Sequence, residues 1–385
     1  MFQSSSLDSE ARIAIENIGW TLGNDCPYRC FHCYSMSARE KGSNLTRSMV
    51  DRVVGQLAIN GIKTVNLGGN EPLFTSGIDA TKTLLPYIIS SLVEREIIVG
   101  LTTAGITVNC LAQEHPGAFG LLNDIDVSID SPFPEEHDKN RGASLFGKAM
   151  SALRKCEEAG IEHTAVMCGM SWNLSDKHID GLVKLARETK SNVRINFIKP
   201  TEPQHLDMLP SPELFYRASM RLLEQCDPVE LGEPLLNTLI GGSGTGCPCG
   251  TKSFRIHSIT PDGKIPISPC VYLHDYRAGD ILVDDLYDIV RSYQFRAFRQ
   301  RLANPGKIPG CAGCDHISVC RGGCSARAYL TSPGHRDLLV QDPYCFKKLE
   351  NFESPRTNNP SDIKVVVEKT LVHRDYLCAL ILAPR

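Results

Sequence analysis

The sequence lacks the features that would direct it to a membrane, out of the cell or onto nucleic acid. Its 385 residues carry a net charge of −3, so no excess of basic residues favours nucleic-acid binding. No apolar run is long enough to span a bilayer. Residues 1–10 also lack the basic-then-apolar pattern of a signal peptide. We therefore expect a cytoplasmic protein with neither nucleic-acid nor membrane partners.

Internal repeats of solenoid length are absent too, and the composition is ordinary for a globular protein, with 42% hydrophobic and 22% charged residues. Short apolar runs of β character alternate with amphipathic segments up to about residue 200. The expected strands are Ile15–Leu22, Thr64–Leu67, Ile97–Thr103, Ile125–Ile129, His163–Met170 and Val193–Ile198. The expected helices between them include Thr46–Asn60, Thr81–Val93, Phe146–Ala159 and Asp176–Thr189. Strands and helices that alternate predict an α/β fold, a partial (β/α)6 TIM-like barrel with its chemistry at the C-terminal ends of the strands.

The rest of the chain divides by composition. Residues 1–200 form the predicted barrel, and residues 201–246 read as a linker that contains a helix at Pro212–Gln225. Residues 247–350 form a cysteine-rich domain. Residues 351–385 form a tail whose apolar run, Ile363–Leu382, is expected to be an edge strand packed on the barrel.

Sixteen cysteines stand out in a chain without an export signal. In a reducing compartment, clustered cysteines more often bind metal or do chemistry than form disulfides. Eleven fall into two groups, three near the N-terminus and eight between Cys247 and Cys345. The other five we expect to be small buried hydrophobes: Cys110, Cys156, Cys168, Cys226 and Cys378.

Three cysteines follow the first expected strand with C-x3-C-x2-C spacing: Cys26, Cys30 and Cys33. Soft thiolates suit an iron–sulfur cluster. Three ligands on four irons leave one iron open to a chelating small molecule. The alternatives are unpaired thiols or a zinc site that uses His32 as its fourth ligand.

This loop resembles that of the radical S-adenosylmethionine (SAM) superfamily, including the aromatic-type residue His32 before the last cysteine. The resemblance implies that SAM binds the open iron and yields a 5′-deoxyadenosyl radical that abstracts a substrate hydrogen. Next, Gly68-Gly69-Asn70-Glu71-Pro72 resembles the G-G-E-P turn that binds the SAM amino group. Asn70 replaces a glycine there, and we expect it to adopt the positive φ that keeps the turn.

Later strand ends extend the resemblance. Thr103 belongs to a T-N-G-like end, and Ser128 to an S-L-D-like end where it would meet the SAM ribose. Arg141 is a further cofactor candidate or a structural clamp, and Ser171, with Asn173, is a weaker one. Asp130 and His137 are weak candidates for a general base because they lie near the expected site.

The eight cysteines resemble the SPASM extension of radical SAM proteins, which binds two auxiliary [4Fe–4S] clusters. The family's pattern assigns Cys247, Cys249, Cys270 and Cys324 to the first auxiliary cluster. It assigns Cys311, Cys314, Cys320 and Cys345 to the second. Only one residue separates Cys247 from Cys249, which leaves open whether Cys247 is a ligand or the first auxiliary cluster has an open iron. Two zinc-ribbon-like sites remain the structural alternative.

The resemblance implies SAM, three [4Fe–4S] clusters and a reductant such as flavodoxin or ferredoxin. Asn70 and the tail Leu371–Leu380 resemble maturases of ribosomally made precursor peptides, including those with Nif11-type leaders. The first strand is expected near residue 15, so a leader would bind the core or a separate partner protein. Two alternatives stay open: a sulfatase-maturating, formylglycine-generating enzyme, and a non-catalytic iron–sulfur electron-transfer protein.

Overall fold

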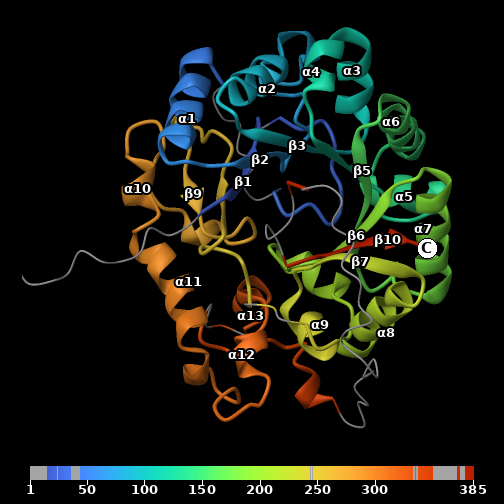
Figure 1. The fold of residues 1–385 in the computed structure, drawn as a ribbon, viewed down its shortest axis with the longest axis vertical. Coiled ribbons are helices and arrows are strands. Elements are labelled where there is room, and N and C mark those ends of the chain that lie inside the picture. Colours follow the sequence, from blue (N-terminus) through green and yellow to red (C-terminus); the bar gives the residue numbers. More distant parts are fainter. Residues whose placement is uncertain are drawn as a thin grey trace, which may run out of the picture.

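The fold is built on one sheet of ten strands. The structure is a computed structural model that describes residues 15–23, 25–35, 44–242, 244, 246–332, 334, 337–349, 371–372 and 378–385. Within these residues the strand order is β7-β10-β6-β5-β4-β3-β2-β1-β8-β9. The sheet curves around a central space, and helices cover its outer face (Figure 1).

The first six strands confirm the predicted partial barrel. They pair in parallel, each with the next along the chain. Their bounds, which differ from the expected ones by two residues at most, are β1 Asn17–Thr21, β2 Thr64–Gly68, β3 Ile98–Thr103, β4 Asp124–Ser128, β5 Glu162–Gly169 and β6 Asn192–Phe197. The helices among and after them are α1 Arg47–Ile59, α2 Leu85–Val93, α3 Ile106–Glu114, α4 Pro116–Gly120, α5 Pro134–Arg141, α6 Phe146–Ala159 and α7 Asp176–Glu188.

Hydrophobic periodicity explains this part of the fold. In α1, Val50, Val53, Val54 and Leu57 recur at helical spacing and are all fully buried. In β3, Val99 and Leu101 belong to the same core. Each such side chain stabilises the fold by about 1.5–3 kcal/mol when it is buried.

Both edges of the six-stranded sheet are extended by later parts of the chain. On one side β8 (Ser253–Ile256) pairs in parallel with β1, and β9 (Ile267–Ser268) follows. On the other side β10 (Leu380–Pro384) pairs antiparallel with both β6 and β7 (Cys226–Leu231). The tail strand therefore lies inside the sheet, and the expectation of an edge strand is wrong. Residues 201–246, expected as a linker with one helix, supply a strand of the sheet as well as α8 (Pro212–Leu223) and α9 (Pro234–Leu239).

The tail also enters the barrel. The backbone N–H of Val372 donates to Oδ1 of Asp124 at 3.0 Å. A side chain at Gly100 of β3 would meet Val372, because a Cβ built there lies 2.9 Å from the Val372 Cβ. The tail thus contacts two barrel strands before it forms β10. Most of the expected strand Ile363–Leu382 lies outside the described residues.

The cysteine-rich part contains short helices joined by turns. Its helices are α10 Leu286–Ile289, α11 Tyr293–Ala303, α12 Ile317–Cys320 and α13 Ser325–Thr331, and its 3-10 turns are η4 His274–Tyr276, η5 Pro305–Lys307 and η6 Phe346–Lys348. Two further 3-10 turns, η2 Ala80–Lys82 and η3 Pro203–Met208, lie earlier in the chain. None of the helices in the described residues combines the length and apolar character that crossing a bilayer requires.

Removing the Leu380 side chain tests the interior position of β10. Leu380 is fully buried, so Leu380→Ala should lower the free energy of unfolding by about 2–5 kcal/mol because it leaves a cavity. Denaturant unfolding of the two proteins measures the difference. Leu206→Ala is the matched control, since Leu206 is 53% exposed and its loss should cost less than about 0.5 kcal/mol. Equal effects of the two substitutions would contradict the placement of β10.

Candidate active site and cluster-binding sites

The three-cysteine loop opens onto a cavity at the C-terminal end of the barrel strands. Cys26, Cys30 and Cys33 all line this cavity, which holds about 1090 Å³ of space that is partly open to solvent. Cys26 and Cys30 are buried. The backbone N–H of Phe31 donates to the carbonyl of Asn140 at 3.1 Å, so the loop is fixed to the end of α5.

Asn70 holds the cysteine loop at both ends. Its Nδ2 donates to the carbonyl of Gly23 at 2.6 Å, and its Oδ1 accepts from the Ser35 hydroxyl at 2.9 Å. The Ser35 Oγ also lies 3.3 Å from the Cys33 Sγ. The expectation of a positive φ at Asn70 is wrong, because Gly69 has the positive φ, 93°. A Cβ at Gly69 would lie 2.4 Å from Oγ1 of Thr21, so only glycine fits.

Glu71 anchors the next part of the cavity wall. Its carboxylate accepts from the backbone N–H of Ala104 at 2.9 Å and of Thr107 at 3.2 Å, and from the hydroxyls of Thr103 and Thr107. These donors include the first turn of α3, where a carboxylate also offsets the helix dipole. Glu71 and Thr103 line the cavity, while their side chains are engaged in holding β2 to β3.

A buried ion pair lies beneath the loop. Asp130 is fully buried, and its Oδ2 lies 2.6 Å from Nε of Arg141 and accepts from Nδ2 of Asn140 at 3.0 Å. Burial alone would raise the pKa of Asp130, but Arg141 and, to a lesser degree, His32 hold it well below its usual range. Asp130 therefore stays ionised and orients Arg141, which lines the cavity. This geometry gives Asp130 a positioning role.

His32 is engaged on both ring nitrogens. Nδ1 lies 2.9 Å from Nδ2 of Asn140, and Nε2 lies 3.5 Å from Oδ2 of Asp130. Because the amide donates to Nδ1, the ring proton belongs on Nε2, facing the carboxylate. Burial lowers the pKa of His32 to about 4, so the ring is neutral. A zinc site with His32 as its fourth ligand does not fit these contacts.

His137 holds the backbone at Asp130, just after β4. Its Nδ1 accepts from the backbone N–H of Asp130 at 3.1 Å, and its ring packs edge-on against Phe146. Burial lowers the pKa of His137 to about 4. Neither His137 nor Asp130 lines the cavity.

Of the other residues expected to bind the cofactor, some line the cavity and some do not. Ser128 lines the cavity, whereas Gly68 and Ser171 do not. Ser171 instead donates its backbone N–H to the carbonyl of Met208 at 2.9 Å. Asn173 is fully buried, and its Nδ2 donates to the carbonyls of Asp130 and Cys168.

Sequence reasoning missed the polar side chains that point from the strands into the barrel. Asn66 of β2, Arg194 and Asn196 of β6, and Arg255 of β8 all line the cavity. Arg194 forms a buried ion pair with Asp126 of β4. The signal was present as polar residues at alternate positions of otherwise apolar strands.

The cysteine-rich part also contributes to the wall of the cavity. Tyr272 lines it beside Tyr34, with ring centroids 5.3 Å apart in an edge-on arrangement. Nε2 of His274 lies 3.0 Å from the carbonyl of Tyr34, and Nζ of Lys199 is 5.2 Å from the centre of the Tyr272 ring. The residues after Cys33 and after Cys270 are therefore in direct contact.

Cys247, Cys249, Cys270 and Cys324, which the resemblance assigns to the first auxiliary cluster, lie close together. All four are buried in one apolar cluster. Cys247 interacts with both Cys249 and Cys324, and Cys249 interacts with Cys270. A fifth thiol, Cys378, belongs to the same cluster, and sequence reasoning missed it.

Cys311, Cys314, Cys320 and Cys345 form a second neighbourhood. Cys345 interacts electrostatically with Cys311 and with Cys320, and Cys314 with Cys311 and Cys345. Asp342 connects the two groups. Its Oδ2 accepts from the backbone N–H of Cys324 at 2.8 Å, and its carbonyl accepts from that of Cys345 at 3.1 Å.

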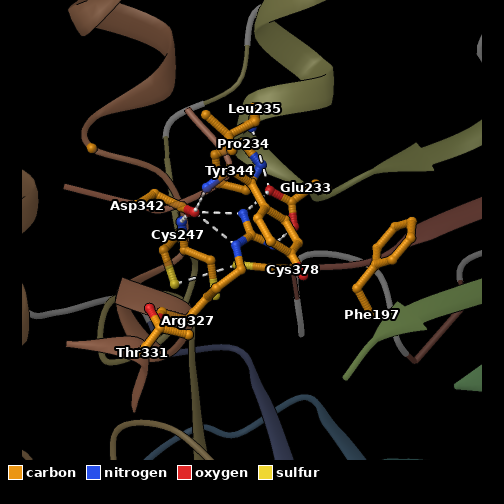
Figure 2. A network of polar contacts seen from close by, with 12 residues as sticks. Phe197, Glu233, Pro234, Leu235, Cys247, Arg327, Thr331, Asp342, Tyr344 and Cys378 are labelled. Atoms are coloured by element: carbon orange, nitrogen blue, oxygen red, sulfur yellow. Dashed lines mark hydrogen bonds and ion pairs between the residues drawn. The ribbon is translucent and has the colours of Figure 1, made fainter. Parts of the chain in front are cut away.

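Asp342 is held by a network of buried charges (Figure 2). Oδ2 of Asp342 accepts from Nη2 of Arg327 at 2.6 Å, and Oε1 of Glu233 accepts from the same nitrogen at 3.0 Å. All three residues are almost fully buried. Removing one partner of such a network would leave an uncompensated charge in the interior.

The surroundings of Arg301 show whether the cysteine-rich part is suited to iron–sulfur clusters. It is fully buried and donates to the backbone carbonyls of Leu338, Val340 and Gly322, while its Nε has no hydrogen-bond partner among the described residues. A buried guanidinium needs negative charge nearby. Asp342 interacts with it electrostatically, and so, to a lesser degree, do Cys247, Cys324 and Cys311. Thiolate-bound clusters would add negative charge to that of Asp342. Within the described residues, no group of His, Cys, Asp or Glu has the arrangement of a single-metal site.

Comparison with known proteins identifies two domains in the chain. The radical SAM superfamily profile matches residues 20–186, and that of the SPASM iron–sulfur cluster-binding domain matches residues 247–315. The chain carries a radical SAM domain and a SPASM domain. Among curated relatives, the mycofactocin maturase MftC of Mycolicibacterium smegmatis is 25% identical over 337 residues, which cover 85% of this chain and 81% of MftC.

Two solved structures share the fold of this radical SAM/SPASM chain. Native anSMEcpe with bound AdoMet and the Kp18Cys peptide has a TM-score of 0.63 at 16% identity, covering 86% of this chain and 94% of that one. Streptococcus suis SuiB bound to the precursor peptide SuiA has a TM-score of 0.60 at 15% identity, covering 86% and 75%.

Asn70→Ala should weaken the cluster loop. The substitution removes two buried hydrogen bonds and leaves the Gly23 carbonyl unpaired, which should cost about 1–3 kcal/mol. We expect a lower melting temperature and faster iron release to a chelator. Asn304→Ala is the control, because the Asn304 side chain makes a single, exposed hydrogen bond, to the carbonyl of Gln300. Iron release as slow as that of the control would contradict the holding role of Asn70.

The buried neutral His137 predicts a pH dependence of stability. In the unfolded chain this group takes up a proton near pH 6.5, whereas in the fold it does so only near pH 4. The unfolded state therefore binds more protons between these values, and stability falls as the pH drops through that range. Between pH 7 and pH 5 the wild type should lose about 2 kcal/mol more than His137→Asn, measured by denaturant unfolding. Equal losses would show that His137 is not the source.

Proposed function

We propose that this chain is a maturase that abstracts a hydrogen atom from a ribosomally made precursor peptide and leaves a crosslink, an excision or another peptide modification. The observation that carries the proposal is a cavity lined by both the three-cysteine loop and the cysteine-rich part, with Cys30 and Tyr272 among its lining residues. The similarity to MftC, a mycofactocin maturase, and the fold shared with SuiB, solved with its precursor peptide SuiA, support a peptide substrate.

The proposed cofactors are SAM and three [4Fe–4S] clusters. Cys26, Cys30 and Cys33 would hold the cluster with the open iron, and the two groups of the cysteine-rich part would hold the auxiliary clusters. SAM bound at a reduced cluster supplies a 5′-deoxyadenosyl radical when it is cleaved. A flavodoxin or ferredoxin would deliver the electron in the cytoplasm, and the leader of the precursor would bind the core of this chain or a separate protein.

The residues of this chain would bind and orient the cofactor. Gly69 allows the close approach of the backbone, Asn70 holds the loop, and Ser128 and Arg141 line the place where SAM would lie. Asp130 keeps Arg141 charged and oriented. The walls that Tyr34 and Tyr272 form would exclude water from the reacting atoms.

Removing a ligand of the cluster at Cys26, Cys30 and Cys33 tests whether the chain is an enzyme that cleaves SAM or an electron carrier. Cys30→Ala should abolish 5′-deoxyadenosine release after anaerobic reduction with dithionite in the presence of SAM. Cys156→Ala is the matched control, because Cys156 is buried in the helical core. Cys314→Ala should retain or weaken SAM cleavage yet reduce the modified product. Retained cleavage in Cys30→Ala would overturn the site, and a wild type that binds iron without cleaving SAM would indicate an electron-transfer protein.

Co-expression identifies the substrate. The chain is expressed with a short precursor peptide encoded beside its gene, and mass spectrometry follows the peptide. A mass change that depends on Cys30 supports the maturase. Conversion of a Cys/Ser-x-Pro/Ala-x-Arg peptide to its formylglycine product, with the precursor unchanged, would identify a sulfatase-maturating enzyme instead.

A further inference from the structure

Five thiols, rather than four, surround the first auxiliary site. Cys378 is 5% exposed and belongs to the same buried cluster as Cys247, Cys249, Cys270 and Cys324. Its Sγ lies 3.4 Å from the Sγ of Cys247, and Figure 2 shows the two side chains together beside the Arg327 network. Cys378 also interacts with Cys324. The thiol therefore faces two members of the ligand set that the sequence pattern implies.

The tail places this thiol from outside the cysteine-rich part. Cys378 stands two residues before β10, whose Leu380 pairs with Ile195 of β6 and Leu231 of β7. Earlier in the tail, Val372 is fixed to Asp124 of β4. Two attachments to the barrel thus flank Cys378, and its position does not depend on the thiols around it.

The number of donors exceeds what one cluster needs. A [4Fe–4S] cluster takes one thiolate at each of its four irons, so one of the five thiols is surplus. The sulfurs of Cys247 and Cys378 lie in contact, 3.4 Å apart. Either thiol is therefore placed to bind the same iron.

We propose that Cys378 is a ligand of the first auxiliary cluster and can take the iron that the sequence pattern assigns to Cys247. Cys249, Cys270 and Cys324 bind the other three irons. This assignment rests on the proposed function, which supplies the cluster. It joins the last strand of the sheet to the cluster, so that metal binding also stabilises the inserted tail.

Iron counting in a chain that holds only auxiliary clusters tests the assignment. The parent carries Cys26→Ala, Cys30→Ala and Cys33→Ala, and after anaerobic reconstitution it should bind about eight irons for two [4Fe–4S] clusters. Three variants of this parent add Cys247→Ala, Cys378→Ala or both substitutions. Cys156→Ala in the same parent is the matched control. Iron, acid-labile sulfide and the EPR spectrum after reduction are measured. We expect each single variant to keep about eight irons and the EPR spectrum of the parent. The double variant, left with three thiolates at the first auxiliary cluster, should show a changed EPR spectrum and release iron to a chelator faster than the parent.

Loss of iron from Cys378→Ala alone would also support a ligand role, as the main ligand of that iron. Cys378→Ala without any effect on iron or the EPR spectrum, whether added to the parent or to Cys247→Ala, would overturn the proposal. So would a disulfide between Cys247 and Cys378, found by mass spectrometry in the anaerobically isolated wild type. A parent without iron would overturn the proposed function together with this assignment.

Cys378→Ser covers the case in which the double alanine variant fails to fold. In the Cys247→Ala background, a serine oxygen on the iron should change the EPR spectrum of the reduced cluster while the iron content is retained. An unchanged spectrum would overturn the proposal.

Discussion

The parallel pairing of β1 with β8 is the constraint on which the site depends. Asn17 lies opposite Ser253 and Trp20 opposite Ile256. The three-cysteine loop follows β1, while Cys249 lies just before β8 and forms a β-bridge with Ser253. Two strands more than 200 residues apart in sequence thus bring the cysteines of both domains to one sheet. The contact between Tyr34 and Tyr272 and their common cavity follow from that register.

Buried charge links the cysteine groups to folding. Arg327 is paired with Asp342 and Glu233, whereas the hydrogen bonds of Arg301 are to backbone carbonyls. Asp342 is the leading electrostatic partner of Arg301, and thiolate-bound iron would add further negative charge. Asp342 holds the backbone at Cys324 and at Cys345. Metal binding at either site would therefore stabilise the same network, and the cysteine-rich domain should be much less stable to unfolding without its clusters.

Local patterns were enough to predict the six barrel strands, whereas the grouping of the later cysteines is what the resemblance to SPASM proteins implies. Alternating apolar residues such as Val99 and Leu101 determine strands, and cysteine spacing is a property of short segments. Asn70 was misjudged because its sequence context suggested a backbone role, whereas its value lies in side-chain contacts with Gly23 and Ser35. The role of Cys378 and the interior position of β10 could not be predicted, because antiparallel insertion between β6 and β7 is a long-range event that no short pattern encodes.

The inserted tail extends the open barrel beyond β6. β10 joins β6 to β7, and β7 belongs to the segment that leads into the cysteine-rich part. Val372 fills the space that Gly100 leaves inside the barrel. A radical reaction needs a cavity that is rigid and shielded from water, because a loose wall would admit competing hydrogen donors. A chain end fixed to the barrel strands and to the thiols of the auxiliary site would keep both walls of the cavity in one relative position.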